Sequence, residues 1–267
     1  MIPALLAALF TLTAPASAGG FDPSDAAEFS VLPGWRTESG THMAAIVVDL
    51  APGWKTYWRS PGEAGIPPSF DWDRSSNLEA VALHWPVPEV FSLNGLRTIG
   101  YVNRLILPIE LSPSKPGAPI ALRTRMELGL CNEICIPMQV TLKADLSADP
   151  AAKDRGIMAA LASGPRTARD GGVRDVRCDV APISDGLRLT TRIDMPRLGR
   201  DEVAVVELKD RSIWVSEAMT ERGNSSLVAE ADLVPVSAAP FMLDRSEVTI
   251  TILSGGEAVE IRGCNAG

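Results

Sequence analysis

Residues 126–140 read MELGLCNEICIPMQV and place two cysteines, Cys131 and Cys135, between two strand-like segments. On one continuous strand their Cα atoms would lie roughly 13 Å apart, beyond the reach of a disulfide. At the two ends of a three-residue hairpin loop they would face each other at about 5 Å. Pro137 argues against a helical turn, the other geometry that brings such residues together. The stretch therefore predicts a β-hairpin closed by a disulfide.

A disulfide across so short a loop removes little entropy from the unfolded chain, so it is a poor structural clamp. It is better suited to being exposed and readily reduced. Zinc would need four ligands at recognisable spacing, and the chain has only His42 and His84, both far from the pair. We expect no metal here, although Cu(I), which favours thiolates and needs fewer ligands, stays open as an alternative.

Charge around the pair indicates the direction of its chemistry. Glu133 lies between the cysteines, and no Lys, Arg or His lies within several residues. A neighbouring carboxylate disfavours the thiolate, so we expect weak nucleophiles. The pattern favours a disulfide that waits for a partner's thiolate, unless the fold brings a distant residue to it.

The rest of the chain is punctuated by 22 Gly and 21 Pro, which favours turns and short strands over long helices. Segments that alternate or are rich in β-branched residues predict strands. These segments are 44–50, 79–84, 105–111, 120–128 and 139–144, and then 187–193, 203–208, 213–217, 227–231, 248–253 and 258–262. We therefore expect an all-β chain of two sandwich domains.

One helical stretch separates the two β-rich regions. DPAAKDRGIMAALASGP (149–165) offers Asp149 as N-cap and Pro150 in the first turn. The charged run RTARDGG (166–172) predicts a flexible linker. The expected domains are 19–147 and 173–267, joined by a helix and linker over 148–172.

The two remaining cysteines, Cys178 and Cys264, open and close the second region. A bridge between them would remove roughly 4–5 kcal/mol of unfolded-state entropy in the chain-entropy model. We interpret the pair as a structural disulfide; a second redox pair is the alternative.

The N-terminus, MIPALLAALFTLTAPASA (1–18), is typical of a signal peptide cleaved near Ala18, although no Lys or Arg precedes its apolar run. That run is too short to span a bilayer, and no other stretch approaches membrane-spanning length. Disulfides are typical of such exported proteins. The net charge of −8 argues against nucleic acid as a partner.

Three segments carry a family resemblance: GWKTYWRSPGEAGIPPSFDW (53–72), TIGYVNRLILPIEL (98–111) and CNEICIP (131–137). Together they resemble the periplasmic N-terminal domain of the thiol:disulfide interchange protein DsbD and the related ScsB-type proteins, over roughly residues 28–146. The resemblance implies an immunoglobulin-like sandwich. Such a domain receives electrons from a membrane-embedded thiol carrier and passes them to oxidised periplasmic proteins.

The resemblance also assigns roles to single residues. Cys131 and Cys135 match the redox pair, with Cys135 as the sulfur that forms mixed disulfides. Phe91, in PEVFSLNG, falls where the family has an aromatic cap over the disulfide, and Tyr101 falls at an aromatic position in the strand leading back to the pair. Three more aromatics fit the motif but are explained equally well as buried sandwich residues: Trp54, Tyr57 and Trp58.

The chain departs from the family in its shorter cysteine interval and in lacking a multi-helix membrane region and a thioredoxin-like domain after it. We therefore expect its electron donor to be a separate inner-membrane thiol carrier of the DsbD/CcdA-like kind, and its substrates to be periplasmic thiol–disulfide proteins. Neither exchange step needs a bound cofactor, because the electrons reside on the sulfurs.

The sequence thus predicts a periplasmic thiol–disulfide exchange protein, a redox relay of the protein-disulfide reductase type. One alternative is an exported binding module, for Cu(I) or a protein partner, with a non-catalytic CxxxC. Another is a structural assembly subunit that uses its sheet edges. A hydrolase is disfavoured, because the chain has no GxSxG or HExxH motif.

Overall fold

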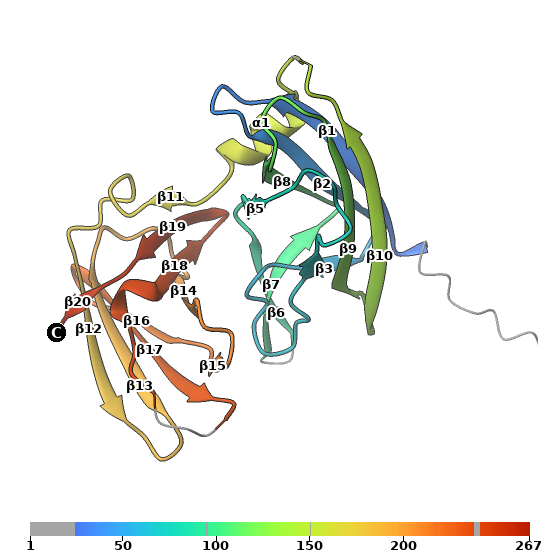
Figure 1. Ribbon diagram of the computed structural model, residues 1–267. Helices are drawn as coiled ribbons and strands as arrows, with labels where there is room; N and C mark the ends of the chain where they lie inside the picture. Colours follow the sequence, from blue (N-terminus) through green and yellow to red (C-terminus); the bar gives the residue numbers. More distant parts are fainter. Residues whose placement is uncertain (1–24, 94–95, 150, 238–240) are drawn as a thin grey trace, which may run out of the picture.

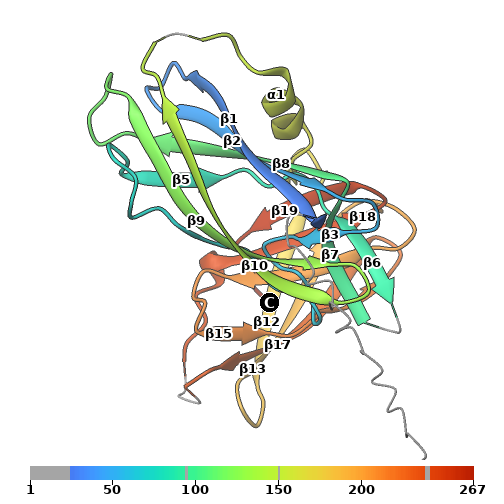
Figure 2. The same ribbon diagram turned by 90° about the vertical axis from the view of Figure 1, so that its right-hand side faces the viewer.

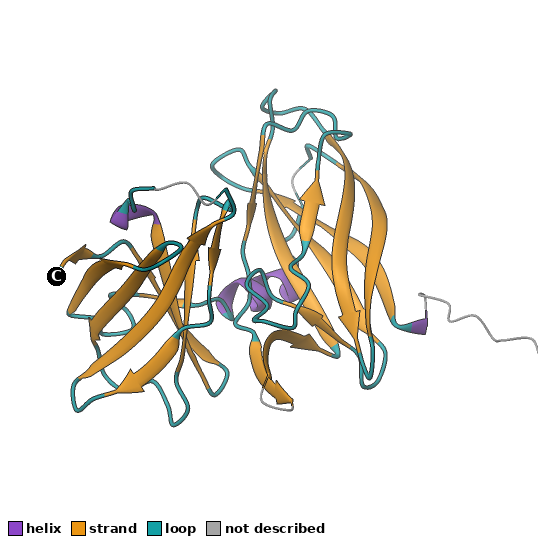
Figure 3. Cartoon of the chain, turned by 90° about the horizontal axis from the view of Figure 1, so that it is seen from below, coloured by secondary structure: helices purple, strands orange, loops and turns teal. Residues whose placement is uncertain are grey.

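The computed structural model describes residues 25–93, 96–149, 151–237 and 241–267. The chain forms two β-sandwiches side by side, with one short α-helix next to the first (Figure 1). Figure 3 shows that strands dominate both units. The predicted all-β class, an immunoglobulin-like sandwich followed by a second β-sandwich, is confirmed. The expected signal peptide, 1–18, lies outside the described residues.

The first sandwich consists of a four-stranded and a six-stranded sheet. The four-stranded sheet has the order β1 (Ala27–Arg36), β2 (His42–Leu50), β8 (Arg104–Ser112) and β5 (Ala80–Leu83). The six-stranded sheet has the order β10 (Cys135–Leu146), β9 (Ile120–Cys131), β3 (Lys55–Tyr57), β7 (Leu96–Val102) and β6 (Glu89–Leu93), with β4 (Ser69–Asp71) pairing with β9.

Strand β2 is buried on both faces, which explains its nearly continuous apolar run. Ala44 and Ile46 point into the sandwich, whereas Met43 and Ala45 point outward. The outer side is covered by helix α1 (Arg155–Ala162), whose Ile157 is fully buried there. The helix therefore belongs to the first sandwich.

Helix α1 begins later than the sequence predicts. The predicted cap, Asp149, lies outside it; instead the Asp154 carboxylate accepts a hydrogen bond from the backbone N–H of Ile157 at 3.0 Å. Because this bond satisfies one of the free N–H groups of the first turn, it fixes the start of the helix. Pro150 lies outside the described residues.

The second sandwich also has a four-stranded and a six-stranded sheet. The first has the order β11 (Arg166–Thr167), β19 (Glu257–Arg262), β18 (Val248–Ser254) and β14 (Val203–Leu208). The second has the order β15 (Ile213–Val215), β17 (Ser226–Pro235), β13 (Leu187–Asp194), β12 (Asp175–Pro182) and β20 (Asn265–Ala266), with β16 (Met219–Arg222) pairing with β17; a 3₁₀-helix, η2 (Arg245–Glu247), precedes β18.

The segment expected to be a flexible linker, 166–172, is instead the start of this second unit. Arg166 and Thr167 form β11, which pairs in parallel with β19. The Arg166 guanidinium also lies 2.8 Å from the Glu257 carboxylate. Arg166 and Thr167 are exposed, as their polarity suggests, but they belong to a sheet edge and not to a flexible linker.

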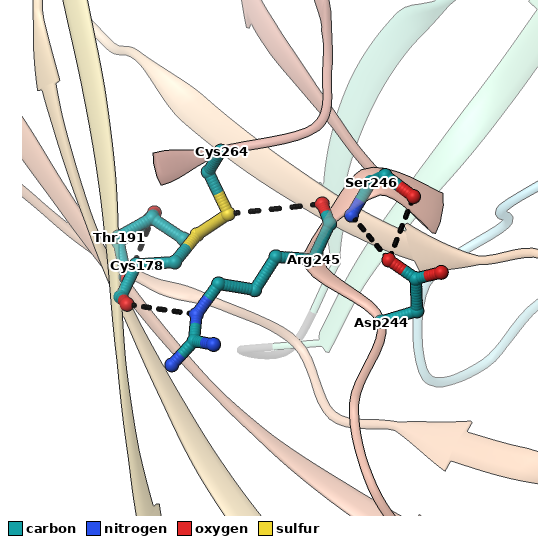
Figure 4. Close-up of a disulfide and its surroundings, with 7 residues drawn as sticks. Cys178, Thr191, Asp244, Arg245, Ser246 and Cys264 are labelled. Atoms are coloured by element: carbon teal, nitrogen blue, oxygen red, sulfur yellow. Dashed lines mark hydrogen bonds between the residues drawn. A yellow bond between two sulfur atoms is a disulfide. The ribbon is translucent and has the colours of Figure 1, made fainter. Parts of the chain in front are cut away.

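Cys178 and Cys264 are bonded to each other and connect β12 to the end of the chain, beside the short parallel pairing of β12 with β20. Cys178 is fully buried. The Arg245 side chain reaches across the disulfide and donates a hydrogen bond to the carbonyl oxygen of Cys178 at 3.2 Å (Figure 4). This disulfide thus cross-links two segments of the second sandwich.

The two sandwiches share an interface with an apolar and a charged part. Four apolar residues of the second unit pack against the core of the first: Val203, Val205, Leu253 and Ala258. Beside them the Arg59 guanidinium, from the first unit, binds the carboxylates of Glu207 and Glu260 at 2.9 and 2.8 Å. Burial disfavours the charged form of Glu260, but the hydrogen bonds and positive charges of Arg59 and Arg262 outweigh it and hold the pKa of Glu260 below its usual value.

Candidate functional site

The CNEIC segment forms the tip of the long β9–β10 hairpin. Cys131 and Cys135 are directly opposite in the register and are disulfide-bonded, with their Cα atoms 4.1 Å apart. The backbone N–H of Asn132 donates to the carbonyl of Ile134 at 3.1 Å and closes the loop. In Figure 2 the two long strands run together toward the side of the domain where β3, β6 and β7 lie. The hairpin predicted from the cysteine spacing is confirmed.

The two cysteines differ sharply in exposure. Cys131 is only 1% exposed, whereas Cys135 is an exposed residue. Ile134, next to Cys135, is 66% exposed and offers an apolar contact beside it. Of the two residues, Cys135 is therefore the more accessible to a thiolate from another protein.

The hydroxyl of Tyr57 contacts both sulfurs of the pair. Its oxygen lies 2.5 Å from Sγ of Cys131 and 3.2 Å from Sγ of Cys135. Disulfide sulfurs carry no hydrogen, so the hydroxyl is the donor. Burial raises the pKa of Tyr57 above its ordinary value, so this donor keeps its proton at neutral pH.

Two glycines create the space for the Tyr57 ring. Gly129 lies two residues before Cys131 on the same face of β9, where a Cβ atom would come within 2.8 Å of the Tyr57 ring. On the other side, a Cβ at Gly65 would lie 2.9 Å from the ring. Real Cβ atoms do not approach so closely, so the absence of both leaves room for the ring in the position from which its hydroxyl reaches the sulfurs.

Lys55 brings a positive charge close to the cysteine pair, although no cation lies near the pair in the sequence. It lies directly opposite Cys131 in the β3–β9 pairing, so the two side chains share one face of the sheet. Its ammonium group lies 5.1 Å from the centroid of the Phe91 ring, in β6. The predicted cap residue Phe91 thus contacts Lys55, the residue opposite Cys131, and it lies on an edge strand rather than in an irregular loop.

Residues 21–147 match the sequence profile of a protein family described as "Thiol:disulfide interchange protein DsbD, N-terminal". The first sandwich belongs to this family. The whole chain also resembles the N-terminal periplasmic domain of ScsB from Proteus mirabilis, with 24% identity, a TM-score of 0.68, and coverage of 96% of this chain and 97% of that one. At this identity the likeness concerns the fold alone, but it includes the second sandwich. No curated protein sequence matches the chain.

Within this DsbD N-terminal domain, Tyr101 lies in the core rather than against the sulfurs. It pairs with Thr56, so it points to the opposite face from Tyr57. Its ring stacks on Trp85 at a centroid distance of 6.4 Å, and its hydroxyl donates to the carbonyl of Pro86 at 2.8 Å. The aromatic that touches the disulfide is Tyr57, which the sequence did not distinguish from the core aromatics.

A signal for Tyr57 and Lys55 was present in the sequence of the DsbD N-terminal domain. In GWKTYW, Lys55 and Tyr57 are two residues apart, so on a strand they share a face. Only the pairing of β3 with β9 shows that this face is the one that carries Cys131. That pairing joins residues far apart in the chain and is not readable from local patterns.

Other features lie away from the sulfurs of this domain. Among the described residues, no group of three or more His, Cys, Asp or Glu side chains is arranged to hold a metal, and no helix is long and apolar enough to cross a membrane. His42 binds the carbonyl of Pro33 at 2.6 Å, and His84 pairs with Glu110 at 3.3 Å. A cleft of about 570 Å³ lies between the two sandwiches and is not lined by Cys131 or Cys135.

Proposed function

We propose that this chain is a periplasmic thiol–disulfide exchange protein that relays two electrons through Cys131 and Cys135. The observation that carries the proposal is the asymmetry of the pair: Cys135 is exposed, and Cys131 is buried with a hydroxyl donor on its sulfur. The membership of the first sandwich in the DsbD N-terminal family supports the same chemistry.

Reduction of the pair follows from this asymmetry. A partner's thiolate attacks Sγ of Cys135, a partner–Cys135 bond forms, and the Cys131–Cys135 bond breaks with its electron pair on Cys131. The partner's second thiolate then attacks the partner's first sulfur, which is bonded to Cys135 in the mixed disulfide. The partner's own disulfide forms, and Cys135 is released as a thiolate. The partner leaves oxidised, and the pair is reduced by two electrons.

Tyr57 favours the first of these steps. The leaving group is the buried Cys131 thiolate, and disulfide exchange is faster when the leaving thiolate is stabilised. The Tyr57 hydroxyl is already 2.5 Å from that sulfur, and its hydrogen bond becomes stronger once the sulfur is charged. Lys55, opposite Cys131, adds a positive charge on the same face. The carboxylate of Glu133 is therefore not the only charge that acts on the pair.

The reduced pair then acts on its substrates in the reverse sense. The Cys135 thiolate attacks the disulfide of an oxidised exported protein, and Cys131 resolves the mixed disulfide. A membrane-embedded thiol carrier of the DsbD/CcdA-like kind is the proposed donor. The family likeness and the predicted signal peptide support a periplasmic location for this exchange.

Trapping in cells tests the relay. In a Cys131→Ser chain, Cys135 keeps its access to partners but cannot be released by Cys131, so mixed disulfides should accumulate. In a Cys135→Ser chain only the buried Cys131 remains, and we expect about tenfold less adduct, because reaction requires an accessible thiolate. Non-reducing gels followed by mass spectrometry of the trapped bands make the comparison.

The identity of the trapped protein decides between the proposed function and its rivals. A membrane thiol carrier or an exported oxidoreductase in the Cys131→Ser band supports the relay. Strong trapping only with Cys135→Ser would reverse the roles of the two sulfurs. If neither variant traps a partner and the reduced protein retains stoichiometric Cu(I), the binding-module alternative is the correct one.

Phe91 is proposed to shield the pair together with Lys55. A cation–π contact at an exposed site is worth about 0.5–1 kcal/mol, so Phe91→Ala should speed reduction by small thiols about two- to fivefold. Val90→Ala is the matched control, because Val90 lies next to Phe91 but points to the other face of β6. The rate constant of Cys131–Cys135 reduction by dithiothreitol measures the effect. Equal rates for Phe91→Ala and the unchanged protein would show that the cover lies elsewhere.

A further inference from the structure

The segment 59–66, between β3 and β4, packs on the residue that contacts the sulfurs. Gly65 lies against one edge of the Tyr57 ring, and Ile66 lies near Gly129 at the other edge. Tyr57 is only 2% exposed because this segment covers it. The position of the Tyr57 hydroxyl therefore depends on where the segment is held.

Carboxylates of the second sandwich hold the start of this segment. Arg59 donates through Nε and Nη2 to the Glu207 carboxylate at 2.9–3.1 Å, and through Nη2 to Glu260 at 2.8 Å. The guanidinium also lies 4.5 Å from the ring centroid of Trp58, which is fully buried in the first core. Arg59 is thus fixed from both sandwiches, and it is two residues from Tyr57.

A third carboxylate of the second sandwich holds the middle of the segment. Glu217 accepts a hydrogen bond from the backbone N–H of Glu63 at 3.4 Å and lies 3.8 Å from the Arg97 guanidinium. The first sandwich contributes a backbone bond from Ile99 to the carbonyl of Pro61 at 2.9 Å. The middle of the segment is thus held by Glu217 from the second sandwich, and Gly65 in turn lies against the Tyr57 ring.

We propose that the second sandwich is a positioning element for the redox pair. Its Glu207, Glu217 and Glu260 hold the segment 59–66, and this segment holds the Tyr57 hydroxyl on the sulfurs of Cys131 and Cys135. This inference deepens the proposed function, and its role in the cell rests on that function. Its effect on the sulfurs is measurable on the purified full chain alone.

The test is a double-mutant cycle on the rate constant for reduction of Cys131–Cys135 by dithiothreitol. Tyr57→Phe should slow reduction about tenfold, the fold-change expected from losing one hydrogen bond to a charged group. The pair Glu207→Gln/Glu260→Gln should slow it about threefold, because Tyr57 stays present but is less well placed. In the Tyr57→Phe background the same pair of changes should have less than about a 1.5-fold effect, since coupled residues are not additive.

A matched control exists within the second sandwich. Arg188 binds the carboxylates of Glu230 and Asp232 at 3.5 and 2.8 Å, again one arginine with two carboxylates. Within the part of the chain that the structure describes, the side-chain hydrogen bonds and ion pairs of these three residues stay inside the second sandwich. Glu230→Gln/Asp232→Asn should leave the rate constant unchanged. A wild-type rate constant in Glu207→Gln/Glu260→Gln would overturn the proposal, and so would an undiminished effect in the Tyr57→Phe background.

Two milder variants keep the test decisive if the double change prevents folding. Glu217→Gln removes only the carboxylate at the middle of the segment, and Arg59→Lys keeps the charge but loses the two-pronged geometry. Each variant should slow reduction of Cys131–Cys135 by about twofold when Tyr57 is present and should have no further effect in the Tyr57→Phe background. Any other result contradicts the proposal. Failure of trapping in cells combined with the expected cycle in vitro would reject the relay and leave the positioning role intact.

Discussion

Reductant titration of the oxidised protein is expected to open Cys131–Cys135 well before Cys178–Cys264. The first bridge closes a sequence separation of 4 residues and the second one of 86. In the chain-entropy model these loops correspond to about 2 and about 4.6 kcal/mol, a difference of about 100-fold in the equilibrium constant. For a two-electron couple this equals about 60 mV, with Cys178–Cys264 the harder to reduce.

Burial acts in the same direction on the kinetics. Cys178 is fully buried and Cys264 half-buried, whereas Cys135 is exposed. Alkylation of free thiols at each potential, followed by mass spectrometry, assigns every cysteine. Equal potentials for the two bridges, or a crossed pairing of the four cysteines, would contradict the division into a redox pair and a structural pair.

The second large effect is expected from the ion pair between Arg222 and Glu202 in the second sandwich. Their side chains are 9% and 2% exposed, and two N–O distances are 2.6 Å. Arg222→Met leaves the Glu202 carboxylate buried, with the backbone N–H of Leu198 as its other donor. Removing one partner of such a pair should lower the free energy of unfolding by about 3–5 kcal/mol.

This loss should depend on pH with a definite sign. Burial disfavours the charged form of Glu202, but the bonds from Arg222 and Leu198 outweigh it and hold its pKa below the usual 4.5. Its contribution is therefore fully present above that value and is lost as pH falls through the lower pKa of the folded state. In Arg222→Met, burial prevails and the pKa rises. The difference in stability between the two proteins should accordingly be largest near neutral pH and smaller at about pH 4.

Urea unfolding of both proteins at the two pH values measures this difference. A difference that stays constant or grows on acidification would contradict the assignment of the pair. Among the described residues, the hydrogen bonds and ion pairs of the Arg222 and Glu202 side chains all lie within the second sandwich. Arg222→Met should therefore leave the reduction rate of Cys131–Cys135 unchanged while the protein is folded. The variant therefore also separates a general loss of stability from a specific effect on segment 59–66.

Several strands show why local patterns predicted part of the fold and failed elsewhere. The β-branched run Val203–Leu208 was predicted with its observed bounds, because a buried strand of that kind has a strong local signal. Strand β1 was missed because Pro33 and Gly34 are typical of a turn. In the structure they lie where the register of β1 with β2 shifts, so the strand continues through a bulge.

What the sequence determined by itself was the local chemistry: the hairpin, the Cys131–Cys135 bond and the two-sandwich class all follow from short-range spacing and alternation. The tertiary structure alone decided what surrounds that bond. Tyr57 and Lys55 reach Cys131 through the pairing of β3 with β9, across more than 70 residues of chain. The segment that packs on Tyr57 is bound through Arg59 to the carboxylates of Glu207 and Glu260, which lie 148 and 201 residues away in the sequence. Such contacts depend on strand register and domain packing, and no local sequence pattern encodes them because each partner is compatible with many others until the sheets have formed.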